Sequence, residues 1–240
     1  MISPPSASVP IPAAAAPLTG AGLRDAETWI FDLDNTLYPA ECNLFVQVQQ
    51  RMGDFIATTF ALDAAAAAEK RKYFFHKHGT TLRGLMVEHG IDPVAFLDYV
   101  HDIDLAALTP LPALSDALER LPGRKLIYTN GTVAHAERIM RRLGVDRHFE
   151  AVFDIVASDY IPKPEAAPYH AMLRRHGVAP ERAVMVEDMA RNLKPAAALG
   201  ITTVWIPTAA AWSQPDPGEN AFIHHTAPDL IAFLAALHAS

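Results

Sequence analysis

Residues 29–36 of the chain read WIFDLDNT, an apolar run that ends in a polar cluster. Its first three residues are β-branched or aromatic, which favours a strand. We expect this strand to be buried, with Asp32 and Asp34 at its carboxyl end. In an extended segment the two aspartates would point the same way, whereas a turn that begins there gives them separate tasks.

Short runs of strand-forming residues recur along the chain, at residues 126–128, 152–156, 184–186 and 203–206. Stretches with helical periodicity alternate with them, at residues 114–121, 133–143, 167–176, 195–199 and 229–238. Pro195 is expected in a first helical turn, where its missing N–H costs little. Such alternation requires right-handed crossovers and helices on both faces of the sheet. The predicted fold class is therefore α/β, with a doubly wound parallel sheet.

Residues 39–109 interrupt this alternation. They show no strand signal, only helical patterns at residues 44–60, 64–78, 82–89 and 93–100. A connection of about 70 residues is far longer than usual, so we predict an inserted helical subdomain above one end of the sheet. Residues 25–38 and 110–240 would then form the α/β core. Residues 1–24 are predicted to be a disordered Pro/Ala-rich tail.

Composition restricts the possible partners. The 240 residues carry a formal net charge of −7, without any lysine- or arginine-rich block. We therefore expect neither a nucleic-acid polymer nor a membrane as partner. Cys42 is the single cysteine, which favours a reducing compartment, and no apolar run reaches the ~18 residues that cross a bilayer. The sequence predicts a soluble cytoplasmic protein and does not determine its oligomeric state.

Polar residues follow the predicted strands, at the sheet edge where parallel sheets bind ligands. They are Asp32, Asp34, Thr129, Asn130, Lys163, Glu187 and Asp188. Clustered carboxylates need a cation, and oxygen ligands favour Mg²⁺. Thr129 and Asn130 precede a helix and offer donors to phosphate oxygens, while Lys163 neutralises a further oxygen. The set predicts a phosphoryl-transfer site in which one carboxylate is a nucleophile and another carries protons.

These motifs resemble those of the haloacid-dehalogenase-like (HAD) hydrolase superfamily. Asp32-Leu33-Asp34-Asn35-Thr36 resembles its DxDxT motif, and Thr129, Lys163 and the pair Glu187-Asp188 resemble the second, third and fourth motifs. The match spans about residues 29–208. The resemblance implies a Rossmann-like core, and it implies that the inserted helices form a C1-type cap.

The resemblance also implies a mechanism. Asp32 would attack phosphorus to form an aspartyl-phosphate, and Asp34 would protonate the leaving oxygen and later activate water. Mg²⁺ would be bound by the Asp32 carboxylate, the Asp34 carbonyl and the Asp188 carboxylate, with Glu187 acting through water. Thr129 and Lys163 would hold the phosphate. Because the dehalogenase branch needs only the first aspartate, Asp34 favours a phosphatase.

The segment of residues 73–85 resembles the cap of the pyrimidine 5′-nucleotidase subfamily, which implies UMP or CMP as substrates. Tyr73, His76 and Arg83 are the candidate substrate residues of this segment, since an aromatic ring stacks on a base and arginine reaches a sugar or phosphate. The aromatic residues of this segment are equally compatible with a purely structural role, in which they pack within the cap. The histidines fall in no zinc-binding spacing and are expected on the surface or in the cap.

Two alternatives remain open. The same machinery could act on another small phosphorylated metabolite, such as phosphoglycolate or a sugar phosphate. A phospho-receiver or binding module also combines an aspartate, Mg²⁺, a threonine and a lysine on an α/β sheet. In receivers, however, the phosphorylated aspartate follows a middle strand and no cap is inserted.

Overall fold

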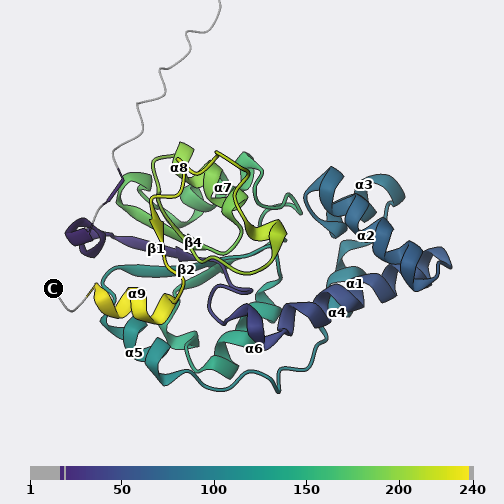
Figure 1. Cartoon of the computed structure of the whole chain (residues 1–240), viewed down its shortest axis with the longest axis horizontal. Coiled ribbons are helices and arrows are strands. Elements are labelled where there is room, and N and C mark those ends of the chain that lie inside the picture. The colour runs from purple at the N-terminus through teal and green to yellow at the C-terminus, as the bar shows by residue number, and fades with distance from the viewer. Residues whose placement is uncertain (1–16, 19, 238–240) are drawn as a thin grey trace, which may run out of the picture.

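The computed structural model describes residues 17–18 and 20–237. Its six strands form one parallel sheet in the order β3-β2-β1-β4-β5-β6, which is the strand order of a doubly wound fold. The predicted fold class is therefore confirmed (Figure 1). The strands are β1 (Thr28–Phe31), β2 (Arg124–Tyr128), β3 (Ala151–Phe153), β4 (Ala183–Glu187), β5 (Thr202–Trp205) and β6 (His225–Thr226).

Helices cover both faces of the sheet (Figure 1). On one face lie α5 (Pro112–Arg120), α6 (Val133–Leu143) and α9 (Leu230–Ala236), and on the other α7 (Ala166–His176) and α8 (Ala190–Ala198). Trp29 and Phe31 belong to the hydrophobic cluster of the first face, and Ile30 belongs to that of the second. Successive side chains of a strand point to opposite faces, so the apolar run of β1 serves both layers.

Two strands differ from the sequence expectation. β3 ends at Phe153 instead of continuing to residue 156, because the carboxylate of Asp154 accepts hydrogen bonds from the N–H groups of Val133 and Ala157. An aspartate that bonds to nearby backbone in this way competes with the ladder of a sheet. β6 was not predicted, since two residues carry no periodicity.

Four α-helices lie between β1 and α5, within the segment expected to be inserted, after a 3₁₀ helix at Ala40–Cys42. They are α1 (Leu44–Phe60), α2 (Ala64–His78), α3 (Thr81–His89) and α4 (Pro93–His101). Ile56, Phe74 and Leu85 are fully buried, and the rings of Phe55 and Phe96 meet edge-on at 5.1 Å. The apolar packing of the insertion is therefore continuous with that of the first face of the core, and Figure 1 shows the insertion projecting from one end of the core.

The predicted boundary of the disordered tail, at residue 24, lies too far along the chain. Gly20–Asp25 forms a 3₁₀ helix, and Leu23 is buried against the core, so apolar contact orders these residues. Residues 1–16 and 19 lie outside the described residues.

The expectation that Pro195 lies in a first helical turn is wrong. This proline lies inside α8, which begins at Ala190. No helix of the described residues is both long and apolar enough to span a membrane.

Candidate active site

The register of the sheet brings the polar strand ends together. Phe31 lies beside Ile127 of β2 and Val186 of β4, and the Asp32 N–H donates to the Val186 carbonyl over 2.9 Å. One step further, Asp32 adjoins the ends of both neighbouring strands. This is the point at which the strand order reverses, and ligands of such sheets bind there.

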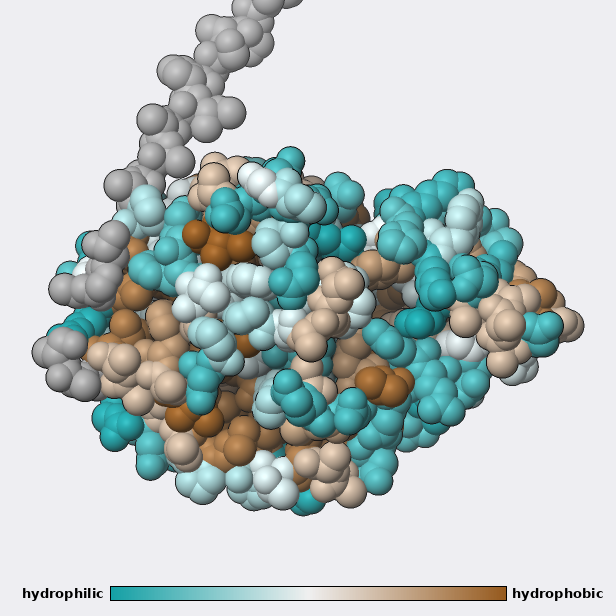
Figure 2. Space-filling view, viewed as in Figure 1, coloured by the Kyte–Doolittle hydropathy of each residue, from teal (hydrophilic) through white to brown (hydrophobic). Residues whose placement is uncertain are grey.

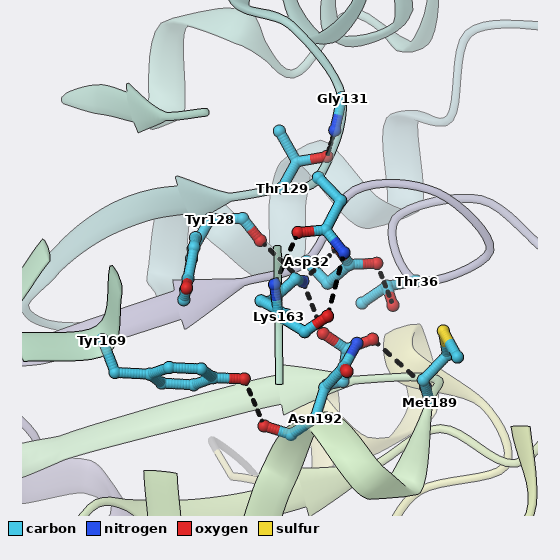
Figure 3. A network of polar contacts seen from close by, with 11 residues as sticks. Asp32, Thr36, Tyr128, Thr129, Gly131, Lys163, Tyr169, Met189 and Asn192 are labelled. Carbon is cyan, nitrogen blue, oxygen red and sulfur yellow. Dashed lines mark hydrogen bonds and ion pairs between the residues drawn. The ribbon is translucent and has the colours of Figure 1, made fainter. Parts of the chain in front are cut away.

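Lys163 is at the centre of the buried site (Figure 3). Its ammonium donates to Asp32 Oδ1 over 2.7 Å, to Glu187 Oε2 over 2.6 Å and to the Tyr128 carbonyl over 2.9 Å. A lysine ammonium has three N–H donors, and all three are used. Lys163 therefore holds the two carboxylates side by side and sits directly beside Asp32.

Asn130 acts on Lys163 through the backbone. Its side-chain oxygen accepts from the Lys163 N–H over 2.9 Å, and its amide nitrogen donates to the Lys163 carbonyl over 3.4 Å. The phosphate-binding role expected for the Asn130 side chain stays a prediction; the structure gives this side chain a positioning role. Thr129 is buried, and its oxygen accepts from the Gly131 N–H over 2.9 Å, which leaves the hydroxyl proton available for a ligand.

The turn after β1 separates the two aspartates, as one reading of the sequence allowed. The backbone of Asn35 is left-handed, with φ of 61°, and the chain then turns into Thr36, whose hydroxyl donates to Asp32 Oδ2 over 3.2 Å. Asp34 Oδ1 instead accepts from the Tyr38 hydroxyl over 2.6 Å and lies 3.0 Å from His135 Nε2. The two carboxylates therefore have different neighbours.

The environments of the two aspartates shift their pKa values in opposite directions. Burial, with a contribution from the Glu187 charge, raises the pKa of Asp32 to about 7, although Lys163 acts in the other direction. Burial also raises the pKa of Asp34, but His135 and Tyr38 stabilise its ionised form more strongly, so this pKa lies below the ordinary value. Carboxylates with separated pKa values are typical of acid–base sites.

A divalent cation fits the acidic cluster. Asp32, Glu187 and Asp188 are all buried, and each offers an oxygen within 4.8 Å of the other two. Asp188 Oδ2 is buried without a hydrogen-bond partner among the described residues, and burial together with the Glu187 charge raises the pKa of Asp188. One ammonium, that of Lys163, is bonded to this cluster. The excess of negative charge and the orphaned oxygen favour a hard cation.

The site opens into a cavity of about 400 Å³ between the core and the helical insertion. In the space-filling view the surface is notched where these two parts meet (Figure 2). Of the three candidate residues of the insertion, His76 lines the cavity, but Tyr73 and Arg83 do not. The Tyr73 hydroxyl contacts Glu88 and Lys77 on the exterior instead. The periodicity of α2 places Phe75 on the cavity side and Tyr73 on another face.

Several residues at the site were not found by sequence reasoning. His135 is 2 % exposed and stacks on His101, with ring centroids 4.2 Å apart, so the expectation that the histidines occupy surface or cap positions is wrong for His135. Arg191 of α8 donates to the Gly79 carbonyl over 3.2 Å and lies 4.4 Å from the Phe75 ring, which links core and insertion. No motif spacing marks these pairs, because they are contacts between distant helices.

His135 is predicted to position Asp34 for proton transfer. In His135→Asn the shorter side chain cannot reach Asp34 Oδ1, so we expect kcat to fall at least about tenfold while KM changes little. Steady-state kinetics with any hydrolysed phosphate ester measures this. His148→Asn is the matched control, since His148 contacts Ser115 and does not line the cavity. An unchanged kcat in His135→Asn contradicts the positioning role.

Comparison with known proteins adds a family match. A family model described as haloacid dehalogenase-like hydrolase matches residues 27–200. Phosphate metabolism protein 8 of Saccharomyces cerevisiae is 24% identical over 191 residues, covering 73% of this chain and 60% of the yeast protein. The chain therefore spans about three fifths of that relative. Phosphoglycolate phosphatase of Colwellia psychrerythraea is 26% identical over 204 residues, covering 76% of this chain and 84% of that protein.

Solved structures share the fold. CbbY from Rhodobacter sphaeroides, in complex with phosphate, superposes with a TM-score of 0.61 at 18% identity and covers 89% of this chain and 99% of its own. L-2-haloacid dehalogenase from Xanthobacter autotrophicus gives a TM-score of 0.56 at 16% identity with the same coverage. At such identities the likeness shows the fold alone, which agrees with the doubly wound sheet described above.

Proposed function

The chain belongs to the haloacid dehalogenase-like hydrolase family, and we propose that it is a divalent-metal-dependent phosphomonoesterase that works through an aspartyl-phosphate. The observation that carries the proposal is the buried network in which Lys163 joins Asp32 and Glu187, beside the orphaned oxygen of Asp188. This network supports the proposal, because the carboxylate proposed as nucleophile, a buried ammonium and an acidic cluster suited to a cation lie side by side. We further propose a cytoplasmic location, since a chain whose single cysteine is Cys42 needs no oxidising compartment.

In the first half-reaction an oxygen of Asp32 attacks the phosphorus atom and the bond from phosphorus to the ester oxygen breaks. Asp34 gives its proton to the departing oxygen. The low pKa of Asp34 in the free protein is raised when a phosphate dianion lies beside it, because like charges disfavour ionisation. The Thr129 hydroxyl donates to a phosphate oxygen, and Lys163 holds Asp32 in place for attack.

In the second half-reaction Asp34 takes a proton from water, and the water oxygen attacks phosphorus. The bond between phosphorus and Asp32 then breaks, which yields inorganic phosphate and the free carboxylate. The ionised state of Asp34, favoured by His135 and Tyr38, suits this role as base. Asp34 therefore takes part in both steps, whereas Asp32 alone is covalently modified.

Asp32, Asp188 and the Asp34 carbonyl would hold Mg²⁺, with Glu187 acting through water. When bound, the ion neutralises the charge of the carboxylates and of the phosphate. Both Glu187 oxygens already have protein partners, Lys163 and the Met189 N–H, which supports an indirect role for this residue. Magnesium is proposed over softer metals because every candidate ligand is an oxygen.

We propose a pyrimidine nucleoside 5′-monophosphate, UMP or CMP, as the substrate. The resemblance of residues 73–85 to the nucleotidase cap supports this proposal. Aromatic side chains in the cavity lining, among them Phe45, Phe75 and Trp212, also support it, since a flat base packs well against such rings. Cavities of this size and apolar character are typical of small-molecule sites.

A phosphate ester with a carboxylate, such as phosphoglycolate, is the second candidate. Arg71 of α2 lines the cavity and is half-buried, yet it has no hydrogen bond or ion pair with any described residue. Burial lowers the pKa of this guanidinium, and no described residue compensates its charge. A carboxylate on the substrate would supply it. The similarity to a phosphoglycolate phosphatase points in the same direction.

Phosphate release from UMP, CMP, AMP, phosphoglycolate and sugar phosphates tests the proposal. With Mg²⁺ we expect turnover of at least one ester, led by UMP or CMP by about tenfold or more, and with EDTA we expect none. Mg²⁺ should also raise the unfolding temperature, because an ion that binds the folded state stabilises it. Turnover led by phosphoglycolate selects the second candidate. If activity in EDTA equals that in Mg²⁺, the proposed metal dependence is contradicted. If no ester is hydrolysed, the proposed phosphomonoesterase activity is contradicted.

A further inference from the structure

A large aromatic side chain remains uncovered at the edge of the cavity. Trp212 is 37 % exposed and lines the same cavity as Asp32. It lies on a short 3₁₀ turn, Ala211–Ser213, that follows β5. Buried Ser213 fixes this turn, since its hydroxyl donates to the Ala210 carbonyl and contacts the Thr208 hydroxyl. A firmly held turn thus presents an indole to the cavity without covering it.

Two residues of α1 complete this part of the wall. The Phe45 ring lies 6.3 Å from that of Trp212 at a tilt of 45°. Gln49 follows Phe45 by four residues, so both side chains emerge from the same side of the helix. Gln49 also lines the cavity, and its amide makes no hydrogen bond within the part of the chain that the structure describes.

The three residues also border a second hollow of about 290 Å³, which they share with Asn35. Asn35 directly follows Asp34 in the chain. The wall formed by Phe45, Gln49 and Trp212 therefore lines both the cavity that contains the carboxylates of Asp32 and Asp34 and the adjoining hollow. A ligand whose phosphate lies at Asp32 has room to extend along this wall.

We propose that Phe45, Gln49 and Trp212 form the subsite that holds the planar base of a nucleoside monophosphate. This inference rests on the proposed phosphatase function and extends it to the part of the substrate that does not react. The indole and phenyl rings offer flat apolar surface, on which a heterocyclic base stacks. The Gln49 amide offers both a donor and an acceptor, which match the donors and acceptors along the edge of a base.

Paired substrates test the subsite. UMP and ribose 5-phosphate present a phosphate on the same sugar, and only UMP carries a base. In Trp212→Leu we expect kcat/KM for UMP to fall at least about tenfold, equivalent to ~1.4 kcal/mol, with ribose 5-phosphate changed less than about threefold. Gln49→Leu should show the same selectivity. Tyr73→Leu is the matched control, because Tyr73 is an exposed aromatic residue that does not line the cavity.

A binding measurement separates this inference from the proposed function. We expect UMP to quench the tryptophan fluorescence of Asp32→Asn, and the quenching to disappear in Asp32→Asn/Trp212→Phe. Equal losses on both esters in Trp212→Leu, or unchanged UMP turnover, overturn the subsite. If the wild-type protein hydrolyses neither of these two esters, the proposal of a nucleotide substrate fails, and if it hydrolyses no ester of the wider panel, the phosphatase proposal fails as well. The fluorescence measurement then tests the subsite by itself. Quenching that is lost in Asp32→Asn/Trp212→Phe supports the subsite, and quenching that persists in this variant overturns it.

Discussion

Asp32→Asn is expected to lower the turnover of every phosphate ester by at least about 10³-fold, because an amide cannot act as the nucleophile. The fold should persist, since Lys163 keeps Glu187 and the Tyr128 carbonyl as partners. Burial raises the pKa of Asp32, so replacing its carboxyl group by a neutral one removes a desolvated charge. Single-turnover kinetics and thermal unfolding of the purified variant measure the two effects.

Asp98→Asn controls for the substitution itself, since Asp98 is exposed on α4 and lies outside the cavity lining. It should retain wild-type rates and stability. Trapping of labelled phosphate on the wild-type protein, and its absence from Asp32→Asn, would identify the covalent intermediate. Wild-type-like turnover in Asp32→Asn contradicts the covalent mechanism. A large drop in unfolding temperature would instead assign Asp32 a structural role.

Lys163→Met is expected to have the largest effect on stability. The substitution leaves the buried carboxylates of Asp32 and Glu187 without their shared ammonium. Removing one partner of a buried ion pair lowers the free energy of unfolding by about 3–5 kcal/mol, because the remaining charge is uncompensated. Activity should be lost as well. Urea unfolding at neutral pH measures the change in the free energy of unfolding.

Added Mg²⁺ distinguishes an electrostatic cause from a packing defect. If unpaired carboxylates destabilise Lys163→Met, the divalent ion should restore part of the lost stability, whereas a packing defect would not respond. Lys77→Met is the matched control, because Lys77 forms an ion pair with Glu88 at 2.8 Å with its own side chain 53% exposed. We expect little change there, since exposed pairs contribute little. Equal effects at the two positions contradict the central role of Lys163.

The fold was largely predictable because its signals are local. Strand-forming runs and helical periodicity located β1, β2, β4 and β5 to within two residues at each end, and the four helices of the insertion to within one. The misplaced elements are those in which local signals compete or are absent. Asp154 ends β3 by capping backbone N–H groups, and the two residues of β6 are ordered by pairing with β5.

Local sequence signals did not predict which residues of the insertion face the cavity. The resemblance singled out Tyr73, His76 and Arg83, and only His76 lines the cavity. A helix that is exposed on several sides presents neighbouring residues in different directions, so a run of aromatic residues does not reveal which ring faces inward. Arg71 and Trp212 line the cavity because α2 and the turn after β5 are packed toward the same space.

The sequence by itself determined that Asp32, Lys163, Glu187 and Asp188 would meet. Asp32, Glu187 and Asp188 directly follow predicted strands, and hydrogen bonding between parallel strands brings their carboxyl ends to one edge whatever the helices do. Lys163 comes from the loop after a third predicted strand, which ends at the same edge. Tertiary structure alone decided that His135, 101 residues away, bonds to Asp34, and that Asn130 holds Lys163. Such pairs depend on how helices and loops pack, and packing is set by the shape of the whole core.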